Sequence, residues 1–380
     1  MKVLFYLGHP AHFHLFKNLF KVLERNNDQI FITIKTKDIL EELLIESGYP
    51  YKNIYPSIRK QSKFSILSAL LIKNSRLIGI IQKFKPDIML GTSIEVAEVG
   101  RLLGIPTAIV NEDDHDVVPQ FAKLGYPFTD FIIAPECCRV GKWTYKKVSY
   151  QSYHELAYLS PQYFKPNQNT LKKYNLNDQR FFIMRFSQLR AYHDQRITGI
   201  TRDLAKNILA RLEKHGNVFI TSENKLDPEL EKYRLKINPR DIHDIIAFAD
   251  LYIGDSQTMA AEAAVLGTPS LRYNDFVGRI GYLDELEFKH NLTFGIKTEE
   301  PEKLLGKIDE LLSKKDLKSQ WQLKAKKMLE SKVDLTLLLF WFIHFFPESG
   351  NILKKEKGFY SEKLLDKNFV DTYNNLMYLN

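Results

Sequence analysis

The chain has 380 residues, of which 44% are hydrophobic and 26% charged, with a formal net charge of +8. This length exceeds one ordinary core and predicts roughly two domains. The two cysteines are adjacent, at Cys137 and Cys138, which argues against a disulfide framework. The first residues, "MKVLFYLG", fit a first strand better than a secretion leader, so we expect a cytoplasmic protein. The positive charge suits an anionic partner, but no dense basic stripe with interleaved aromatics indicates nucleic acid.

Short β-rich runs alternate with helical patterns over the first 135 residues. Helical spacing of apolar residues is clear in "FHLFKNLFKVLER" and in "FSILSALLIKNSRLIGIIQKF". Strands alternating with helices predict a parallel sheet with right-handed crossovers. The strands are expected at residues 2–7, 29–34, 87–90, 106–110 and 130–134.

The alternation restarts after a Tyr-, Pro- and Asn-rich segment, 136–179, which we expect to be a linker. Helices fit residues 200–216, 241–249 and 302–315. Further strands are expected at residues 180–186, 216–222, 251–254 and 269–272. The sequence therefore predicts an α/β protein of two halves, each of which begins with a strand.

The most apolar run, "LTLLLFWFIHFF" at Leu335–Phe346, is shorter than the ~20 residues that a membrane-spanning helix needs. Two alternatives stay open for it. It can be a helix buried against one domain, or an interfacial helix whose aromatic side chains lie at the depth of lipid headgroups.

Two loops in the first half carry ionisable residues at expected strand ends, where parallel sheets bind ligands. The loop "GHPAHFHLF" holds three histidines, and His12 and His14 are candidate general bases because imidazole titrates near neutral pH. The alternative is a packed or helix-capping histidine. The loop "NEDDHD" (111–116) includes Glu112, a candidate acid or base. Consecutive residues cannot all converge on one ion, so a metal site is not expected there, and a solvated acidic loop remains the alternative.

The second half offers an anion site at two further strand ends. Arg185, Ser187 and His193, in "RFSQLRAYHD", are candidate partners of a phosphate, because guanidinium matches phosphate oxygens. A plain surface loop is the alternative. In "IGDSQTMAAEAAVLGTPSL", Ser256 or Asp255 can cap a helix whose free N–H groups would bind an anion.

Glu262 is the one carboxylate in that otherwise apolar helix. Burying it unpaired would cost several kcal/mol, so it needs a protein partner or a ligand hydroxyl. A ligand that carries both a phosphate and a diol would satisfy the helix start and the carboxylate together. A nucleoside diphosphate is such a ligand.

The stretch "ADLYIGDSQTMAAEAAVLGTPSL" resembles the nucleotide-sugar half of GT-B enzymes, which include MurG-like glycosyltransferases and UDP-GlcNAc 2-epimerases. The loop "HPAHFH" and the segment "YHELAYLSP" are similar to the DUF354 family. The resemblance implies a GT-B fold, with two Rossmann-like parallel-sheet domains facing a central cleft: an acceptor-side domain at 1–155, a nucleotide-sugar-binding domain at 156–335, and an aromatic helix and tail at 336–380. It also implies diphosphate contacts from Ser256, Gln257 and Thr258, a ribose contact from Glu262, and His12 as the acceptor base.

One departure separates the activities within this superfamily. The epimerases carry Gly-Asp-Thr after the fourth strand, whereas this sequence has Gly91 followed directly by Thr92. Glu112 nevertheless lies where the epimerases have a catalytic glutamate. We therefore expect a metal-independent, cofactor-free glycosyltransferase of surface-polysaccharide biosynthesis that takes a UDP-sugar donor and a glycan or lipid-linked acceptor, with peripheral contact to the inner face of the membrane. An epimerase or hydrolase, and a non-catalytic nucleotide-sugar binder, remain the alternatives.

Overall fold

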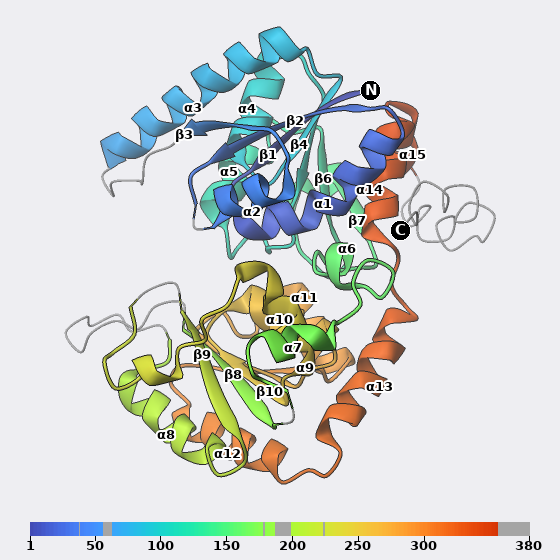
Figure 1. The fold of residues 1–380 in the computed structure, drawn as a ribbon. Helices are drawn as coiled ribbons and strands as arrows, with labels where there is room; N and C mark the ends of the chain where they lie inside the picture. Colours follow the sequence, from blue (N-terminus) through green and yellow to red (C-terminus); the bar gives the residue numbers. More distant parts are fainter. Residues whose placement is uncertain (38, 56–62, 178, 187–198, 223–224, 356–380) are drawn as a thin grey trace. The chain divides into compact units, whose positions relative to one another are not determined.

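The computed structural model describes residues 1–37, 39–55, 63–177, 179–186, 199–222 and 225–355. The contacts of the chain divide it into two compact units. Unit 1 comprises Met1–Tyr158 together with the chain from Lys332 onward, and unit 2 comprises Leu159–Ser331. Each unit has a parallel sheet covered by helices, so the predicted α/β class is confirmed (Figure 1).

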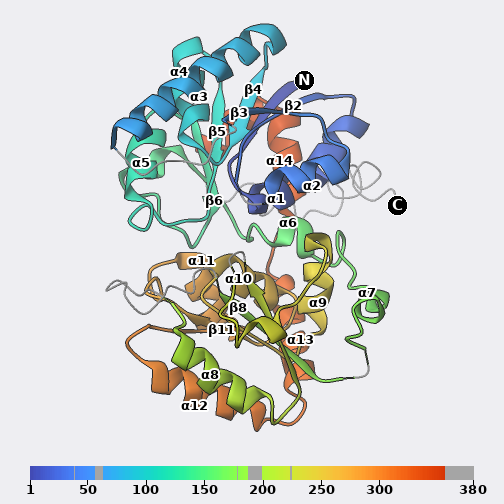
Figure 2. The same ribbon diagram turned by 60° about the vertical axis from the view of Figure 1, so that its left-hand side comes forward.

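The sheet of unit 1 has seven parallel strands in the order β3-β2-β1-β4-β5-β6-β7. Helices α1, α2 and α14 cover one face, and α3, α4 and α5 cover the other (Figure 2). The strands are β1 Lys2–Leu7, β2 Gln29–Lys35, β3 Tyr51–Tyr55, β4 Ile88–Gly91, β5 Thr107–Val110, β6 Phe131–Pro135 and β7 Lys147–Tyr150. The helices are α1 Pro10–Arg25, α2 Leu40–Ser47, α3 Lys63–Phe84, α4 Ile94–Leu103, α5 Pro119–Gly125, η1 Gly141–Lys146, α6 Leu156–Leu159 (which runs into unit 2), α14 Leu335–His344 and α15 Glu348–Lys355.

The sheet of unit 2 has five parallel strands in the order β12-β11-β10-β8-β9. Helices α8 and α12 lie side by side on one face (Figure 2), and α9 and α10 lie on the other. The strands are β8 Phe181–Phe186, β9 Asn217–Ser222, β10 Leu251–Gly254, β11 Ser270–Tyr273 and β12 Thr293–Ile296. The helices are α7 Gln168–Lys173, α8 Arg202–Leu212, η2 Glu231–Tyr233, η3 Pro239–Asp241, α9 Ile242–Phe248, α10 Gln257–Val265, α11 Gly281–Asp284, η4 Glu285–Lys289, α12 Pro301–Leu312 and α13 Leu317–Leu329.

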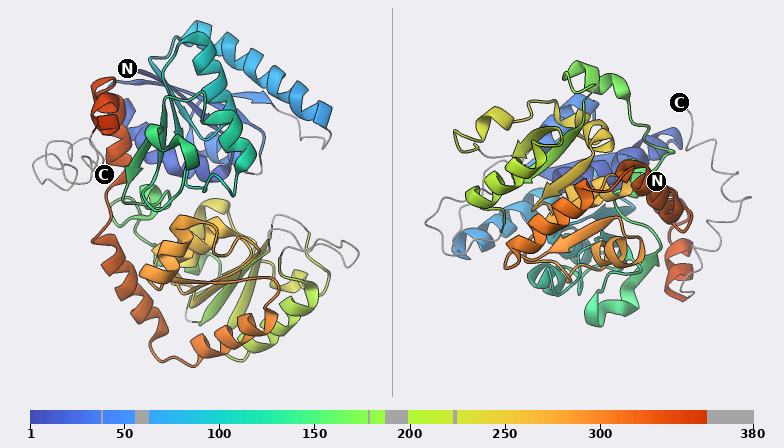
Figure 3. Two further views of the ribbon diagram at one scale, coloured as in Figure 1. Left: turned by 180° about the vertical axis from the view of Figure 1, so that it is seen from behind. Right: turned by 90° about the horizontal axis from the view of Figure 1, so that it is seen from below.

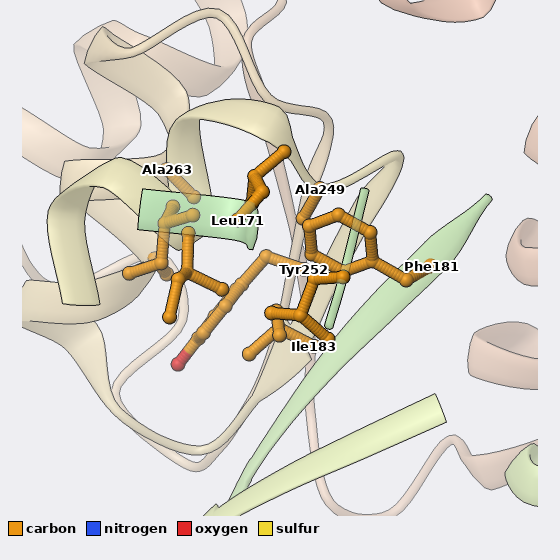
Figure 4. Close-up of a cluster of buried hydrophobic side chains, with 10 residues drawn as sticks. Leu171, Phe181, Ile183, Ala249, Tyr252 and Ala263 are labelled. Carbon is orange, nitrogen blue, oxygen red and sulfur yellow. The ribbon is translucent and has the colours of Figure 1, made fainter. Parts of the chain in front are cut away.

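Small side chains let α10 pack closely on the sheet of unit 2. Ala260 and Ala263 are fully buried in one cluster with Ile183 of β8 and Tyr252 of β10 (Figure 4). Residue 254 of β10 must be glycine because a Cβ there would lie 2.9 Å from the carbonyl oxygen of Arg185 on the neighbouring strand β8. The apolar composition of α10 therefore reflects a helix that is enclosed by protein.

The aromatic helix α14 is buried in unit 1. Every residue from Leu335 to Ile343 is buried, and the Phe342 ring meets the Phe131 ring of β6 edge to face at 5.2 Å. Figure 3 shows α14 running along unit 1. The structure thus shows the buried alternative for this helix. No helix in the described part of the chain combines the length and apolar character needed to cross a bilayer.

Three strands of the structure were not predicted, because they lack a clear apolar run. Strand β3 contains Lys52 and Asn53, and the four residues of β12 include Gly295. Strand β7 lies inside the segment 136–179, so the expectation of a linker is wrong for residues 147–150. Strands β3, β7 and β12 are all at sheet edges, where a short and partly polar strand is sufficient because only one neighbour pairs with it.

We expect Phe342→Ala to destabilise the protein by about 3–5 kcal/mol, because it removes a fully buried ring. Phe345, on the same segment, is 37% exposed and provides the matched control, for which we expect a loss of about 1 kcal/mol. Urea denaturation followed by circular dichroism measures both. Equal losses in the two variants would mean that α14 does not depend on its contact with β6.

Candidate functional site

The strand order of unit 2 reverses between β8 and β10, which is where doubly wound sheets bind their ligands. Arg185 of β8 and Gly254 of β10 are register partners at this point, and the Asp255 N–H donates to the Arg185 carbonyl oxygen at 3.3 Å. Two residues predicted for the anion site, Arg185 and Ser256, therefore lie at the ends of adjacent strands. Ser187 and His193 lie outside the described residues.

Helix α10 begins directly after this crossing. Of the two predicted N-cap candidates, Ser256 and Asp255, the N-cap is Ser256, and its Oγ accepts the N–H of Met259 at 3.4 Å. Gln257 and Thr258 form the first two helical positions and are partly buried. The N–H groups at the start of a helix carry a partial positive charge, so this turn can bind an anion.

Glu262 is 5% exposed, and its partner is a histidine that the sequence analysis did not identify. Glu262 Oε1 lies 3.0 Å from Nε2 of His243, which is 4% exposed and belongs to α9. The ring of His243 packs edge to face against Phe164 at 6.2 Å. The protein therefore holds this carboxylate in one orientation through a neighbouring helix.

The strand order of unit 1 reverses between β1 and β4, and the His-rich loop follows β1 at this point. Its histidines occupy three different environments. His9 is the N-cap of α1 and accepts the Ala11 N–H at 3.2 Å. His14 lies against the Tyr158 ring, with 5.2 Å between centroids. His12 instead reaches across to Thr92, at the end of β4.

The hydrogen bonds of His12 fix its tautomer. Its Nδ1 accepts the Gly8 N–H at 3.0 Å and contacts the Thr92 hydroxyl. Burial, and to a smaller degree His9 and His154, holds the pKa of His12 well below its ordinary value, so the ring is neutral. A neutral ring whose Nδ1 accepts carries its hydrogen on Nε2. In this arrangement the Nε2–H of His12 can donate a hydrogen bond but cannot accept a proton, so the predicted role of His12 as the base would need the other tautomer.

Most of the acidic loop after β5 has a structural role. Asp114 is fully buried and accepts the Arg139 N–H at 2.8 Å, and Asp116 accepts from the Arg139 guanidinium at 3.1 Å. Asn111 donates to the Asp113 carbonyl oxygen at 2.8 Å. Ion pairs and turn bonds thus account for these residues better than a solvated loop does.

Glu112 forms a pair with His154, which follows β7. Glu112 Oε2 accepts the backbone N–H of His154 at 3.1 Å, and its Oε1 lies 3.4 Å from His154 Nδ1. Burial lowers the pKa of His154 to about 3. Burial, together with Glu155 and Asp113, raises the pKa of Glu112 well above its ordinary value. The pair lies near His12, since His154 contributes to the lowered pKa of that ring.

Neither histidine partner was predicted from the sequence, and for one reason. His243 and His154 lie outside the strand-end loops, in a helix and in the segment "YHELAYLSP". A buried acid signals that a partner exists, but only packing shows which residue it is. Among the described residues, no three His, Cys, Asp or Glu side chains converge as a metal site.

The pKa shifts of His12 and His154 predict acid sensitivity. Their folded-state pKa values lie below the ~6.5 of an unfolded histidine, so below that pH the unfolded chain binds protons that the folded chain does not. Each group should lower the unfolding free energy by up to about 1.4 kcal/mol per pH unit as the pH falls from 6 to 4. Glu112, with its raised pKa, acts in the opposite direction.

Urea denaturation at pH 7.5 and pH 5 should therefore show a smaller acid loss in His12→Asn and His154→Asn than in the wild type. His215, exposed in unit 2, is the control position, and His215→Asn should leave the pH dependence unchanged. An unchanged pH dependence in all three variants would contradict the assignment of neutral, desolvated rings.

Solved structures with the same fold include nucleotide-sugar enzymes. The S. aureus MnaA–UDP complex matches with a TM-score of 0.67 at 14% identity, over 92% of this chain and 97% of that chain. A putative UDP-N-acetylglucosamine 2-epimerase from Listeria monocytogenes has a TM-score of 0.65 at 15% identity, over 92% and 97%. The spinosyn rhamnosyltransferase SpnG, complexed with spinosyn aglycone, has a TM-score of 0.57 at 11% identity, over 90% of this chain and 99% of that chain. This likeness confirms the GT-B fold.

No curated protein matches the chain when sequences are compared. A family model does match, over residues 1–280, and its description is "Protein of unknown function (DUF354)". The match includes the His-rich loop, the segment that holds His154 and the whole of α10, which are the parts that carried the resemblance. The chain belongs to the DUF354 family.

Proposed function

We propose that the protein is a glycosyltransferase that takes a sugar from a UDP-sugar donor and joins it to a hydroxyl of a glycan or lipid-linked acceptor. The observation that carries the proposal is the end of β10, where a capped helix start and a fixed, buried glutamate lie six residues apart, at Ser256 and Glu262. The helix start suits the diphosphate, and the glutamate suits the ribose diol. Arg185, from the adjacent strand, adds a cation to the same edge.

The diphosphate is the leaving group of such a transfer. Negative charge develops on it as the bond to the sugar breaks, so donors fixed in advance at the helix start stabilise the transition state. The proposal needs no metal, because backbone N–H groups and a guanidinium can perform this role. In the proposed pathway, polysaccharide biosynthesis in the cytoplasm, the acceptor is held by unit 1 and meets the protein at the inner face of the membrane.

Epimerisation of a UDP-sugar is the second candidate function. It is favoured by Glu112, which follows β5 as the resemblance requires, and by the fold shared with the putative epimerase from Listeria monocytogenes. Thr92 disfavours an epimerase function, since the resemblance places an aspartate of the epimerases at this position, whereas Thr92 contacts His12. Incubation of UDP-GlcNAc with no acceptor, followed by proton NMR, separates the two: a 2-epimer appears only if the second candidate is correct.

The donor site is tested by isothermal titration calorimetry with UDP. We expect wild-type protein to bind UDP, and Glu262→Gln to weaken binding by about 10- to 100-fold, the worth of a hydrogen bond to a charged group. Glutamine keeps an acceptor for His243, so the fold should be preserved. Glu302→Gln, on the exposed face of α12, is the matched control and should bind as the wild type does.

A second titration isolates the ribose contact. Wild-type protein should bind 2′,3′-dideoxyuridine diphosphate more weakly than UDP, whereas Glu262→Gln should bind the two more nearly alike, because it lacks the charged acceptor. Equal affinity of the wild type for both nucleotides would show that the ribose assignment of Glu262 is wrong. No binding of any UDP compound would show that the proposed donor is wrong.

A further inference from the structure

The dyad of Glu112 and His154 is an arrangement that the proposed donor site leaves unexplained. His154 Nε2 is buried and has no hydrogen-bond partner among the described residues, although the side chain as a whole is 12% exposed. A polar atom that no protein group satisfies is open to a ligand, a water molecule or a transferred proton. The opposite nitrogen of the ring, Nδ1, is the one that faces Glu112.

We propose that His154 is the general base that deprotonates the acceptor hydroxyl and that Glu112 orients the His154 ring. His12 donates a hydrogen bond from its Nε2 and does not act as the base. The inference rests on the proposed transfer reaction. It assigns the base to a residue outside the His-rich loop, and it gives Glu112 a positioning role.

The geometry of the dyad sets the direction of proton transfer. Glu112 receives the backbone N–H of His154 on Oε2, and it has Oε1 turned to Nδ1, so the carboxylate holds both the ring and its Nδ1 hydrogen. The lone pair is then left on Nε2. His12 has the reverse pattern, because the Gly8 N–H occupies its Nδ1 and leaves the hydrogen on Nε2.

The charge of Glu112 offsets part of the cost of placing a proton on His154, which burial opposes. Burial disfavours charge on both partners: it raises the pKa of Glu112 and lowers that of His154. When Glu112 is ionised and His154 is neutral, the partly buried pair has a net charge of −1, and Glu155 nearby makes that charge more costly. Accepting a proton at Nε2 neutralises the pair as a whole.

The proposed transfer breaks two bonds and forms two. The acceptor O–H bond breaks and its proton goes to His154 Nε2, while the oxygen lone pair forms the bond to the anomeric carbon of the donor sugar. The bond between that carbon and the diphosphate oxygen breaks, and its electron pair leaves on the diphosphate. When no acceptor is present, water supplies the hydroxyl and the donor is hydrolysed.

Chemical rescue tests the assignment. UDP release from a panel of UDP-sugars, with no acceptor added, should fall by about 100- to 10,000-fold in His154→Gly, the usual worth of a general base. Added imidazole should raise the UDP-release rate of His154→Gly at least about tenfold, because it can occupy the vacated space and accept the proton. His12→Gly should show no such rescue. His215→Gly, exposed in unit 2, should keep the wild-type rate.

UDP affinity separates this inference from the proposed function. If the wild type binds UDP, His154→Gly should bind it within about twofold, since His154 is not among the residues proposed to bind the nucleotide. A wild-type rate in His154→Gly, or rescue by imidazole of His12→Gly alone, would overturn the inference and leave the donor site intact. Failure of the wild type to bind UDP would instead overturn the proposed function.

A spectroscopic measurement decides the matter even if His154→Gly does not fold. In protein labelled with ¹⁵N-histidine, the long-range ¹H–¹⁵N spectrum at pH 8 should show His154 with its hydrogen on Nδ1 and His12 with its hydrogen on Nε2. Glu112→Gln should alter the His154 signals and leave those of His12 in place. A hydrogen on Nε2 of His154 in the wild type would overturn the assignment.

Discussion

The cost of burying a carboxylate governs both units of this protein. An ionised carboxyl group that leaves water without a partner loses several kcal/mol, so a buried acid must be paired or give up its charge. In unit 2, Glu262 meets His243, which is 19 residues away in the sequence. In unit 1, Glu112 meets His154, 42 residues away. Each pair joins two elements, so it forms only when those elements pack correctly.

Parallel strand order explains why these pairs lie near the edges where ligands bind. In each sheet the order reverses once, between β1 and β4 in unit 1 and between β8 and β10 in unit 2. Connections diverge at such a point, so the loops on either side leave room for a ligand and the helix starts converge on it. His12 and Thr92 meet across the first reversal, and Arg185 and Ser256 follow adjacent strands at the second.

The two carboxylate–histidine pairs differ in which imidazole nitrogen faces the acid. His243 presents Nε2 to Glu262, while His154 presents Nδ1 to Glu112 and keeps Nε2 away from it. The first pair lies inside a packed helical layer, beside Phe164, and serves to hold the acid still. The second leaves a ring nitrogen without a partner among the described residues, which suits proton transfer. Similar chemistry therefore supports two roles, and the backbone position of each histidine decides between them.

Local patterns in the sequence determined the α/β class, nine of the strands to within about two residues, and a capped start of α10 at Ser256 or Asp255, of which the structure has Ser256. These features depend on neighbours along the chain, through alternating apolar side chains and through a hydroxyl placed three residues before the N–H that it caps. The edge strands β3, β7 and β12 carry too little apolar pattern to be found in this way. Only the tertiary structure decided that α14 is covered by unit 1, that the three histidines of one loop have separate environments, and that His243 and His154 are the partners of Glu262 and Glu112. The physical reason is that a buried charge specifies the need for a partner, whereas the identity of that partner depends on which distant segments the packing of the sheets and helices brings within a few ångströms.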